Sequence, residues 1–193
     1  MAKKQARPYH HGDLRTALVA ATLELVEEHG PRGFSLTEAA RRAGVSAAAP
    51  YRHFENKDAL LAAIVVEGNQ LLAKEMRQAV GKRPLDRAAL PDLAAAYVAF
   101  ASRHRAYFMV IFSAGIDKAL FPAVAPSARA ALGVAVEAAG NEADAVACWT
   151  IAHGVAALAL DGALETTQPE VEPEELARTT VAAHFGLSLG RRD

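Results

Sequence analysis

Two helix-start signals separated by a glycine constrain the first third of this chain more than any other feature. The run SLTE that begins at Ser35 matches a capping box, in which the Ser35 hydroxyl and the Glu38 carboxylate each bond a free backbone N–H. Gly44 can take the left-handed conformation that ends a helix, and Ser46 is a good N-cap for the next one. The sequence therefore predicts two short helices joined by a tight turn.

The second helix of this pair contains a proline. Pro50 lies only four residues past Ser46, where at most one intrahelical hydrogen bond is lost, so we expect a short, stiff helix and not a break. Val45, Tyr51 and Phe54 are expected to anchor this helix against its neighbours.

Longer helices are expected before and after the pair. Over residues 13–29 apolar side chains recur at helical spacing until Gly30 stops the pattern. Asn56 can cap another helix, whose apolar face continues until Gly81 and which is long enough to link two bodies. No sustained alternation of apolar and polar residues indicates a strand, so the chain is predicted to be all-α. Further helices are expected over 86–105, 106–114, 123–139, 142–166 and 173–187.

Charge is uneven along the chain. The net charge is −1, so a surface that attracts nucleic acid must be a local patch. Up to Lys57 the chain carries nine Lys or Arg and six Asp or Glu, whereas the remainder is acidic. Lys3, Lys4 and Arg7 precede the first helix, and a basic arm of this kind can enter a minor groove. We therefore expect the N-terminal third to meet DNA.

Catalysis and metal binding are disfavoured by the motifs that the sequence lacks. It contains no HExxH, P-loop or GxSxG pattern and no cluster of Cys and His at ligand spacing. We expect neither an enzyme, nor a cofactor, nor a metal site.

The expected location is the cytoplasm. Cys148 is the only cysteine, which fits a reducing compartment, and no apolar stretch follows Lys3 and Lys4 as a signal peptide would need. The uncharged span 145–160 is too short to cross a bilayer comfortably and contains His153, so a buried helix is expected there and no membrane partner.

Two stretches of the sequence carry a resemblance to a known family. Residues 12–61, above all the parts AARRAGVS and YRHFENKDALL, resemble the DNA-binding domain of the TetR family of bacterial transcriptional regulators. The segment CWTIAHGVAAL, with Trp149, His153 and Gly154, is similar to the tryptophan-histidine-glycine signature of one type of C-terminal domain in that family.

The resemblance implies a homodimer of all-α subunits. Residues 1–56 would form a three-helix helix-turn-helix domain with an N-terminal arm, and 57–193 a helical domain for dimerisation and ligand binding, linked by a helix over 57–80. The last two helices, 142–166 and 173–187, would form the dimer interface. The dimer would set two reading helices, one in each subunit and each the helix that follows Gly44, about 34 Å apart on a palindromic operator. Most members repress and are released by a small-molecule inducer.

By position, the resemblance also assigns the DNA contacts. The reading helix carries three alanines, whose methyl groups can only touch thymine methyls or let the backbone approach the DNA closely. Arg52 is therefore the candidate for a guanine contact, with a phosphate contact as the alternative. Tyr51 can donate to a phosphate, and Lys57 opens a helix whose N–H groups favour an anion. The assigned residues are Thr37, Arg41, Ala47, Ala48, Ala49, Tyr51, Arg52, His53 and Lys57.

A ligand site is expected among the middle helices. Trp149 and His153 stand one helical turn apart, and they either line a cavity or pack internally with the imidazole bonded to a carbonyl. An aromatic cluster over 107–112 is placed beside them by the resemblance. The candidate ligand-binding residues are His104, Phe108, Met109, Phe112, Asp117, Trp149 and His153.

A different function remains open at this point. The alanines of the reading helix also fit an all-α homodimer that binds a ligand or a protein and no longer reads DNA, although Tyr51, Arg52 and Lys57 at these spacings favour a DNA-binding surface. The sequence leaves open the operator, the regulated genes, the inducer and the sign of regulation.

Overall fold

Helices account for the regular structure of the chain. The computed structural model describes residues 11–189, and no strand occurs in that range, so the all-α prediction is confirmed. The basic arm expected at Lys3, Lys4 and Arg7 lies outside the described residues. The elements are α1 (His11–His29), α2 (Leu36–Arg42), η1 (Pro50–Arg52), α3 (Lys57–Val80), η2 (Arg87–Ala89), α4 (Leu90–Arg103), α5 (Arg105–Ser113), η3 (Lys118–Leu120), α6 (Val124–Ala139), α7 (Glu142–Leu160), α8 (Ala163–Thr167) and α9 (Pro173–Phe185).

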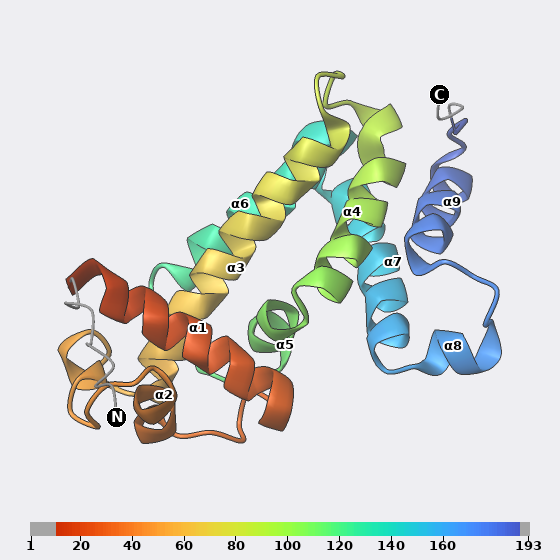
Figure 1. Ribbon diagram of the computed structural model, residues 1–193. Helices are drawn as coiled ribbons and strands as arrows, with labels where there is room; N and C mark the ends of the chain where they lie inside the picture. The colour runs from red at the N-terminus through yellow and green to blue at the C-terminus, as the bar shows by residue number, and fades with distance from the viewer. Residues whose placement is uncertain (1–10, 190–193) are drawn as a thin grey trace.

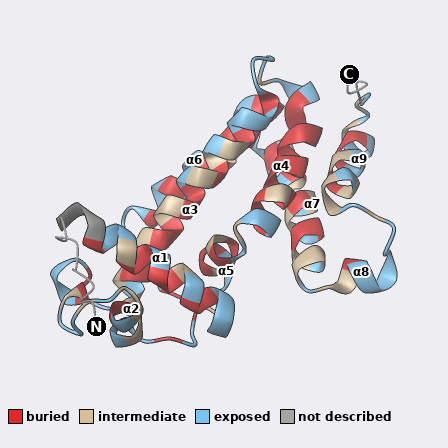
Figure 2. Cartoon of the chain, in the orientation of Figure 1, coloured by how far each residue is buried: buried red, intermediate tan, exposed pale blue. Residues whose placement is uncertain are grey.

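The helices form two groups joined by α3. Figure 1 shows α1, α2 and the η1 segment gathered at one end of the molecule, while α3 runs away from them alongside α6 and α4. On the far side α7 packs against α4 and α6, and α9 packs against α4 and α7. The buried residues lie along α4 and the inner faces of α3 and α7, whereas α8 is mostly exposed (Figure 2).

The turn after α2 has the geometry that its glycine predicts. Gly44 has φ of 73°, in the left-handed region. The Val45 N–H donates to the Ala40 carbonyl at 3.0 Å and the Gly44 N–H to the Arg41 carbonyl at 3.1 Å, which is a Schellman motif. At the other end of α2 the Ser35 hydroxyl accepts from the Glu38 N–H at 3.1 Å. The Ser35 half of the predicted capping box and the turn are therefore confirmed, whereas the Glu38 carboxylate bonds no backbone N–H among the described residues.

The reading helix itself is shorter than the sequence analysis expected. Only Pro50–Arg52 is helical, and it is a single 3₁₀ turn preceded by turns over 47–49. Ser46 makes no side-chain cap on it; its carbonyl accepts from the Ala49 N–H at 3.0 Å instead. Pro50 has no N–H, so it cannot donate the i to i−4 hydrogen bond that an α-helix needs at this residue. The segment is held mainly by i to i+3 hydrogen bonds, as in a 3₁₀ turn. The expectation of an intact short helix was wrong.

The expected helix over 142–166 is broken in two. Gly162 has φ of 73° and separates α7 from α8, because a glycine in the left-handed region ends one helix and redirects the chain. The expectation that this span is buried was also wrong. By length and composition α7 would pass for a membrane helix, yet only 28% of it is buried, and Val146, Trp149 and Leu158 leave between 37% and 48% of their surface exposed.

A close crossing sets the distance between α3 and α5. A Cβ added at Gly68 would lie 2.9 Å from both Ile111 Cδ1 and Tyr107 Cδ1, which is too close for a side chain without movement of α5. The Tyr107 hydroxyl also donates to the Glu67 carboxylate at 2.5 Å. Because α5 in turn contacts α1, this crossing connects the two groups of helices.

Candidate nucleic-acid interface and ligand cavity

The residues assigned to DNA share one exposed surface around α2 and η1. Buried partners hold that surface in place: Ala39 and Ala40 of α2 are fully buried, and Phe54 is 5% exposed. Within the reading segment, residues 47–53, Pro50 is buried and the other residues are exposed or partly exposed. Exposed among the assigned residues are Thr37, Arg41, Ala47, Ala48, Tyr51, Arg52 and His53, while Ala49 and Lys57 are partly buried.

Tyr51 and Phe54, both expected to anchor the reading segment, differ in burial. Tyr51 is 58% exposed, so the expectation that it anchors the segment was wrong. Phe54 and the buried Pro50 provide the anchor, with the Arg15 guanidinium 5.8 Å from the centre of the Phe54 ring. The Tyr51 hydroxyl is left available for a partner outside the protein.

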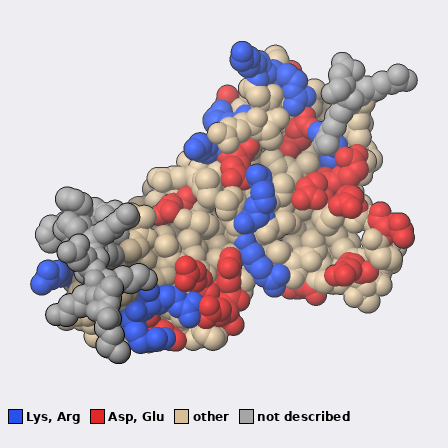
Figure 3. All heavy atoms as spheres, viewed as in Figure 1, with Lys and Arg blue, Asp and Glu red and all other residues tan. Residues whose placement is uncertain are grey.

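The basic side chains at this end fall into two groups. The Arg42 guanidinium bonds the Glu28 carboxylate at 2.5 and 2.7 Å, and this hydrogen bond holds the pKa of Glu28 below its usual value. Arg41 and Arg52 make no hydrogen bond or ion pair with any residue of the range 11–189. Figure 3 shows Lys and Arg atoms over α2 with acidic atoms beside them. Arg41 and Arg52 are therefore the arginines there that can bind phosphate or base.

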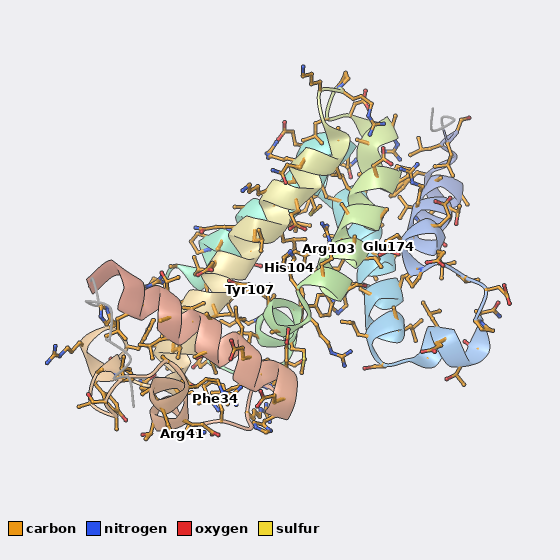
Figure 4. All side chains as sticks on the ribbon, in the orientation of Figure 1. Phe34, Arg41, Arg103, His104, Tyr107 and Glu174 are labelled. Atoms are coloured by element: carbon orange, nitrogen blue, oxygen red, sulfur yellow. The ribbon has the colours of Figure 1, made fainter. Side chains whose placement is uncertain are left out.

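Lys57 is bound within the protein. Its ammonium donates to the carbonyls of Phe34 at 2.8 Å and Arg32 at 3.1 Å, and it lies 4.2 Å from the centre of the Phe34 ring. Burial lowers the pKa of this ammonium, although Asp58 acts in the opposite direction. The side chain thus fastens the start of α3 to the loop before α2, which carries Phe34 (labelled in Figure 4).

A cavity of about 420 Å³ lies among the helices α3 to α7. Its volume is within the range of small-molecule sites, about 300–1,000 Å³. Residues of α3, α4, α5, α6 and α7 form most of the walls, which are mainly aliphatic, and Tyr97, Phe112 and Trp149 supply the aromatic surface. Six lining residues carry a side-chain N–H, O–H or S–H group: Asn69, Tyr97, Lys118, Arg129, Cys148 and Trp149.

A chain of hydrogen bonds crosses one wall of the cavity. The Trp149 Nε1–H donates to the Tyr97 hydroxyl at 3.2 Å, and the same hydroxyl lies 2.9 Å from His153 Nδ1. Since the Tyr97 oxygen accepts from Trp149, its own proton is free to bond a neutral imidazole at Nδ1. Burial lowers the pKa of His153 and raises that of Tyr97, which favours this neutral arrangement.

The other candidate ligand residues are placed apart from the cavity walls. His153 stands behind Tyr97 and stacks on Phe108 with ring centres 5.5 Å apart. His104 bonds the Glu75 carboxylate at 2.8 Å, between α3 and α4 (Figure 4). Asp117 caps η3 through the Ala119 N–H. Of the expected set, Phe112 and Trp149 line the cavity, whereas His104, Phe108, Met109, Asp117 and His153 are not among its lining residues.

Sequence reasoning missed most of the polar residues of the cavity. Asn69 lies on the apolar face of α3 and is 4% exposed; its amide donates to the Ser127 hydroxyl at 3.0 Å. A single polar residue within an apolar helical face was the one available signal. Lys118 and Arg129 come from the single turn η3 and from the amphipathic helix α6, where a sequence pattern gives no sign of a cavity.

Cys148 is a packing residue of the cavity wall. Its thiol lies 3.7 Å from the Leu90 carbonyl, and burial raises its pKa to about 12. A thiol with that pKa is neutral and a poor nucleophile. Among the described residues no group of three or more His, Cys, Asp or Glu side chains is placed to hold a metal ion.

Two family models match the chain over both groups of helices. The model described as bacterial regulatory proteins, tetR family, matches residues 18–64, and the tetracyclin repressor-like C-terminal domain matches residues 90–184. No curated protein matched the sequence significantly.

Solved structures share the fold. A protein of unknown function from Rhodococcus sp. RHA1 is 28% identical with a TM-score of 0.78, over 95% of this chain and 100% of that one. A bacterial regulatory protein in the tetR family from Rhodococcus RHA1 is 21% identical with a TM-score of 0.68, over 90% and 95% of the two chains. The fatty acid degradation regulator FadR from Bacillus halodurans is 15% identical with a TM-score of 0.67, over 92% and 97%. The chain belongs to the TetR family of bacterial regulatory proteins and is a DNA-binding transcriptional regulator.

Proposed function

We propose that the protein is a homodimeric repressor that binds a palindromic operator and is released by a small-molecule inducer. The observation that carries this proposal is the reading segment: Tyr51 and Arg52 are exposed, while Phe54 and Pro50 are buried beneath them. An anchored backbone with exposed donors is what a major-groove contact needs. The domain division is residues 1–56 for DNA and 57–193 for dimerisation and ligand binding.

The exposed side of α7 supports the dimer. Val146, Thr150, Gly154 and Leu158 are exposed at successive turns along one side of α7, and an exposed helical side made mostly of apolar and small residues marks an interaction site. A two-fold partner is self-complementary, so the same face of a second copy would cover it. Burial of this side of α7 against a second copy would also explain why so apolar a helix occurs in a protein that we place in the cytoplasm.

The DNA contacts divide by chemistry. We assign Arg52 to a guanine edge, and Tyr51, Arg41 and Thr37 to phosphates, because these residues are exposed on one surface. His53 can follow either group. Ala47, Ala48 and Ala49 allow a close approach and touch thymine methyls. Lys57 has the different role of fastening α3 beneath this surface, given its bonds to Arg32 and Phe34.

The coupling between ligand and DNA would pass through α3. This helix starts at Lys57 beside the reading segment, and Val65, Asn69, Leu72 and Met76 of the same helix line the cavity. A ligand can act only by favouring one arrangement of α3 over another, and a coupling of about 1–3 kcal/mol changes operator affinity roughly 5- to 150-fold. We assign the protein no catalytic activity.

Selection from randomised DNA with sequencing of the retained fraction tests the proposal. We expect a palindromic motif in which no single base-pair change costs more than about 3 kcal/mol, because few side chains read bases. Arg52→Ala should blur one position in each half-site, and Arg41→Ala should weaken binding evenly and reduce the salt slope by about two, one phosphate contact being lost in each half-site.

Lys74→Ala is the matched control, because Lys74 is an exposed cation on α3 outside the reading surface. It should leave both the motif and the salt slope unchanged. Retention of DNA without any motif would overturn the proposal and return the protein to the class of all-α ligand- or protein-binding dimers.

A further inference from the structure

The charges around the cavity are of one sign. Lys118 of η3 and Arg129 of α6 line it, and none of its lining residues is an Asp or a Glu. Neither cation forms an ion pair with any residue in the range 11–189. The nearest acid along the chain, Asp117, uses its carboxylate to accept from the Ala119 N–H. An uncompensated positive potential therefore faces an apolar space.

The neutral polar groups of the cavity are already bonded within the protein. The Asn69 amide donates to Ser127, the Trp149 indole to Tyr97, and the Cys148 thiol to the Leu90 carbonyl. A ligand that used these groups would have to break existing hydrogen bonds, and a broken buried bond costs about 1–3 kcal/mol. These groups therefore shape the cavity more than they offer contacts to a ligand.

The two cations keep donors to spare. The Lys118 ammonium has three donors and uses one of them on the Ile111 carbonyl at 3.1 Å. The Arg129 guanidinium has five donors, and none of them bonds a residue of the described range. Lys118 and Arg129 are both exposed residues, so an anion can reach them without opening the core. A bidentate contact from Arg129 suits a planar carboxylate.

We infer that the inducer is an amphipathic anion, with an apolar body in the cavity and one carboxylate or similar group held by Lys118 and Arg129. This inference rests on the proposed inducer cavity and names its ligand class. The aliphatic walls take the body, since burial of apolar area contributes roughly 25 cal/mol per Å² without any directional contact. The two cations supply the selectivity against neutral and cationic molecules of the same shape.

Trp149 provides a direct readout of occupancy. It is the only tryptophan of the chain and it lines the cavity, so its emission reports binding without any DNA present. The probes are octanoate, octanamide and octylamine, which have the same chain length and differ in charge. We expect octanoate to bind at least tenfold more tightly than octanamide, and octylamine to bind most weakly.

Charge-removing variants locate the contact. Lys118→Gln and Arg129→Gln should each weaken octanoate binding between about threefold and tenfold, which is the effect of one partly exposed charge pair, and leave octanamide unchanged. Arg105→Gln is the matched control, since Arg105 is an exposed arginine outside the cavity lining. Ala128→Phe, on the exposed side of the cavity wall, should weaken both probes by filling the space.

Three results would overturn the inference. One is octanamide or octylamine binding as tightly as octanoate. Another is octanoate binding that neither glutamine variant weakens. The last is the absence of any change in tryptophan emission and of any calorimetric heat with all three probes. Because these measurements use no DNA, selective octanoate binding together with failure of the DNA selection would refute the proposed function and leave the ligand class standing.

Discussion

The start and the middle of α3 lie in different chemical settings. At its start, Lys57 and Asn56 make polar contacts with backbone atoms, and the side chains assigned to DNA stand outside them. In its middle, Val65, Asn69 and Leu72 face a cavity held by side-chain packing. The difference indicates that DNA reading can be changed without changing stability, whereas at the cavity stability and ligand binding change together.

The largest expected effect is the difference in unfolding free energy between alanine substitutions at two aromatic residues three positions apart. Phe54→Ala removes a ring that is 5% exposed and should lower the free energy of unfolding by about 3–5 kcal/mol. Tyr51→Ala removes a ring that is 58% exposed and should change it by less than about 0.5 kcal/mol while weakening operator binding at least tenfold. Denaturant titration and fluorescence anisotropy measure the two. Equal losses of stability would break the comparison.

The next effect concerns the crossing of α3 and α5. Gly68→Ala places a methyl group 2.9 Å from Ile111 and Tyr107, so it should destabilise the protein by about 1–3 kcal/mol. Gly133→Ala is the control, because a Cβ at that helical position meets nothing within 4 Å. It should stabilise the protein by up to about 1 kcal/mol through helix propensity. Thermal unfolding that shifts in the same direction for both variants would contradict this account of the crossing.

The smallest effect is the dependence of stability on pH through His153. Burial lowers its pKa below the usual 6.5, so the unfolded chain binds more protons than the folded one between the lowered pKa and about pH 6.5. The contribution is complete above that pH and is lost as the pH falls. His153→Asn keeps an acceptor for the Tyr97 hydroxyl and cannot titrate, so its stability should fall less on the acid side. An unchanged acid slope in denaturant titrations would argue against a neutral His153.

Helix ends were predictable because single residues set them. Ser35 and Asn56 act as N-caps, and Gly44, Gly81 and Gly140 take positive φ where helices end. These signals are local, since one side chain or one missing Cβ determines the backbone within a turn. They fixed most of the element boundaries and, with the family resemblance, the position of the reading surface.

Other features depend on distant contacts and were missed. The conformation of the segment around Pro50 depends on whether the packing of Phe54 can stabilise a segment with few α-helical hydrogen bonds. The segment forms a single 3₁₀ turn. Lys57 met the Phe34 and Arg32 carbonyls, which are 23 and 25 positions away. Lys118 and Arg129 reach the same cavity only because η3 and α6 fold together. Local sequence patterns carry no information about contacts between residues that lie far apart in the chain.

The most direct test of the central claim compares one protein on two duplexes. The affinities for the selected palindrome and for a scrambled duplex of the same composition are measured at one salt concentration, for the unaltered protein and for Arg52→Ala. We predict a specificity ratio of at least about 10³ for the unaltered protein and a ratio at least about 30-fold smaller for Arg52→Ala, because each of the two half-sites loses a contact worth about 1–3 kcal/mol. Equal affinity of the unaltered protein for the two duplexes would contradict the claim that this alanine-rich segment reads DNA.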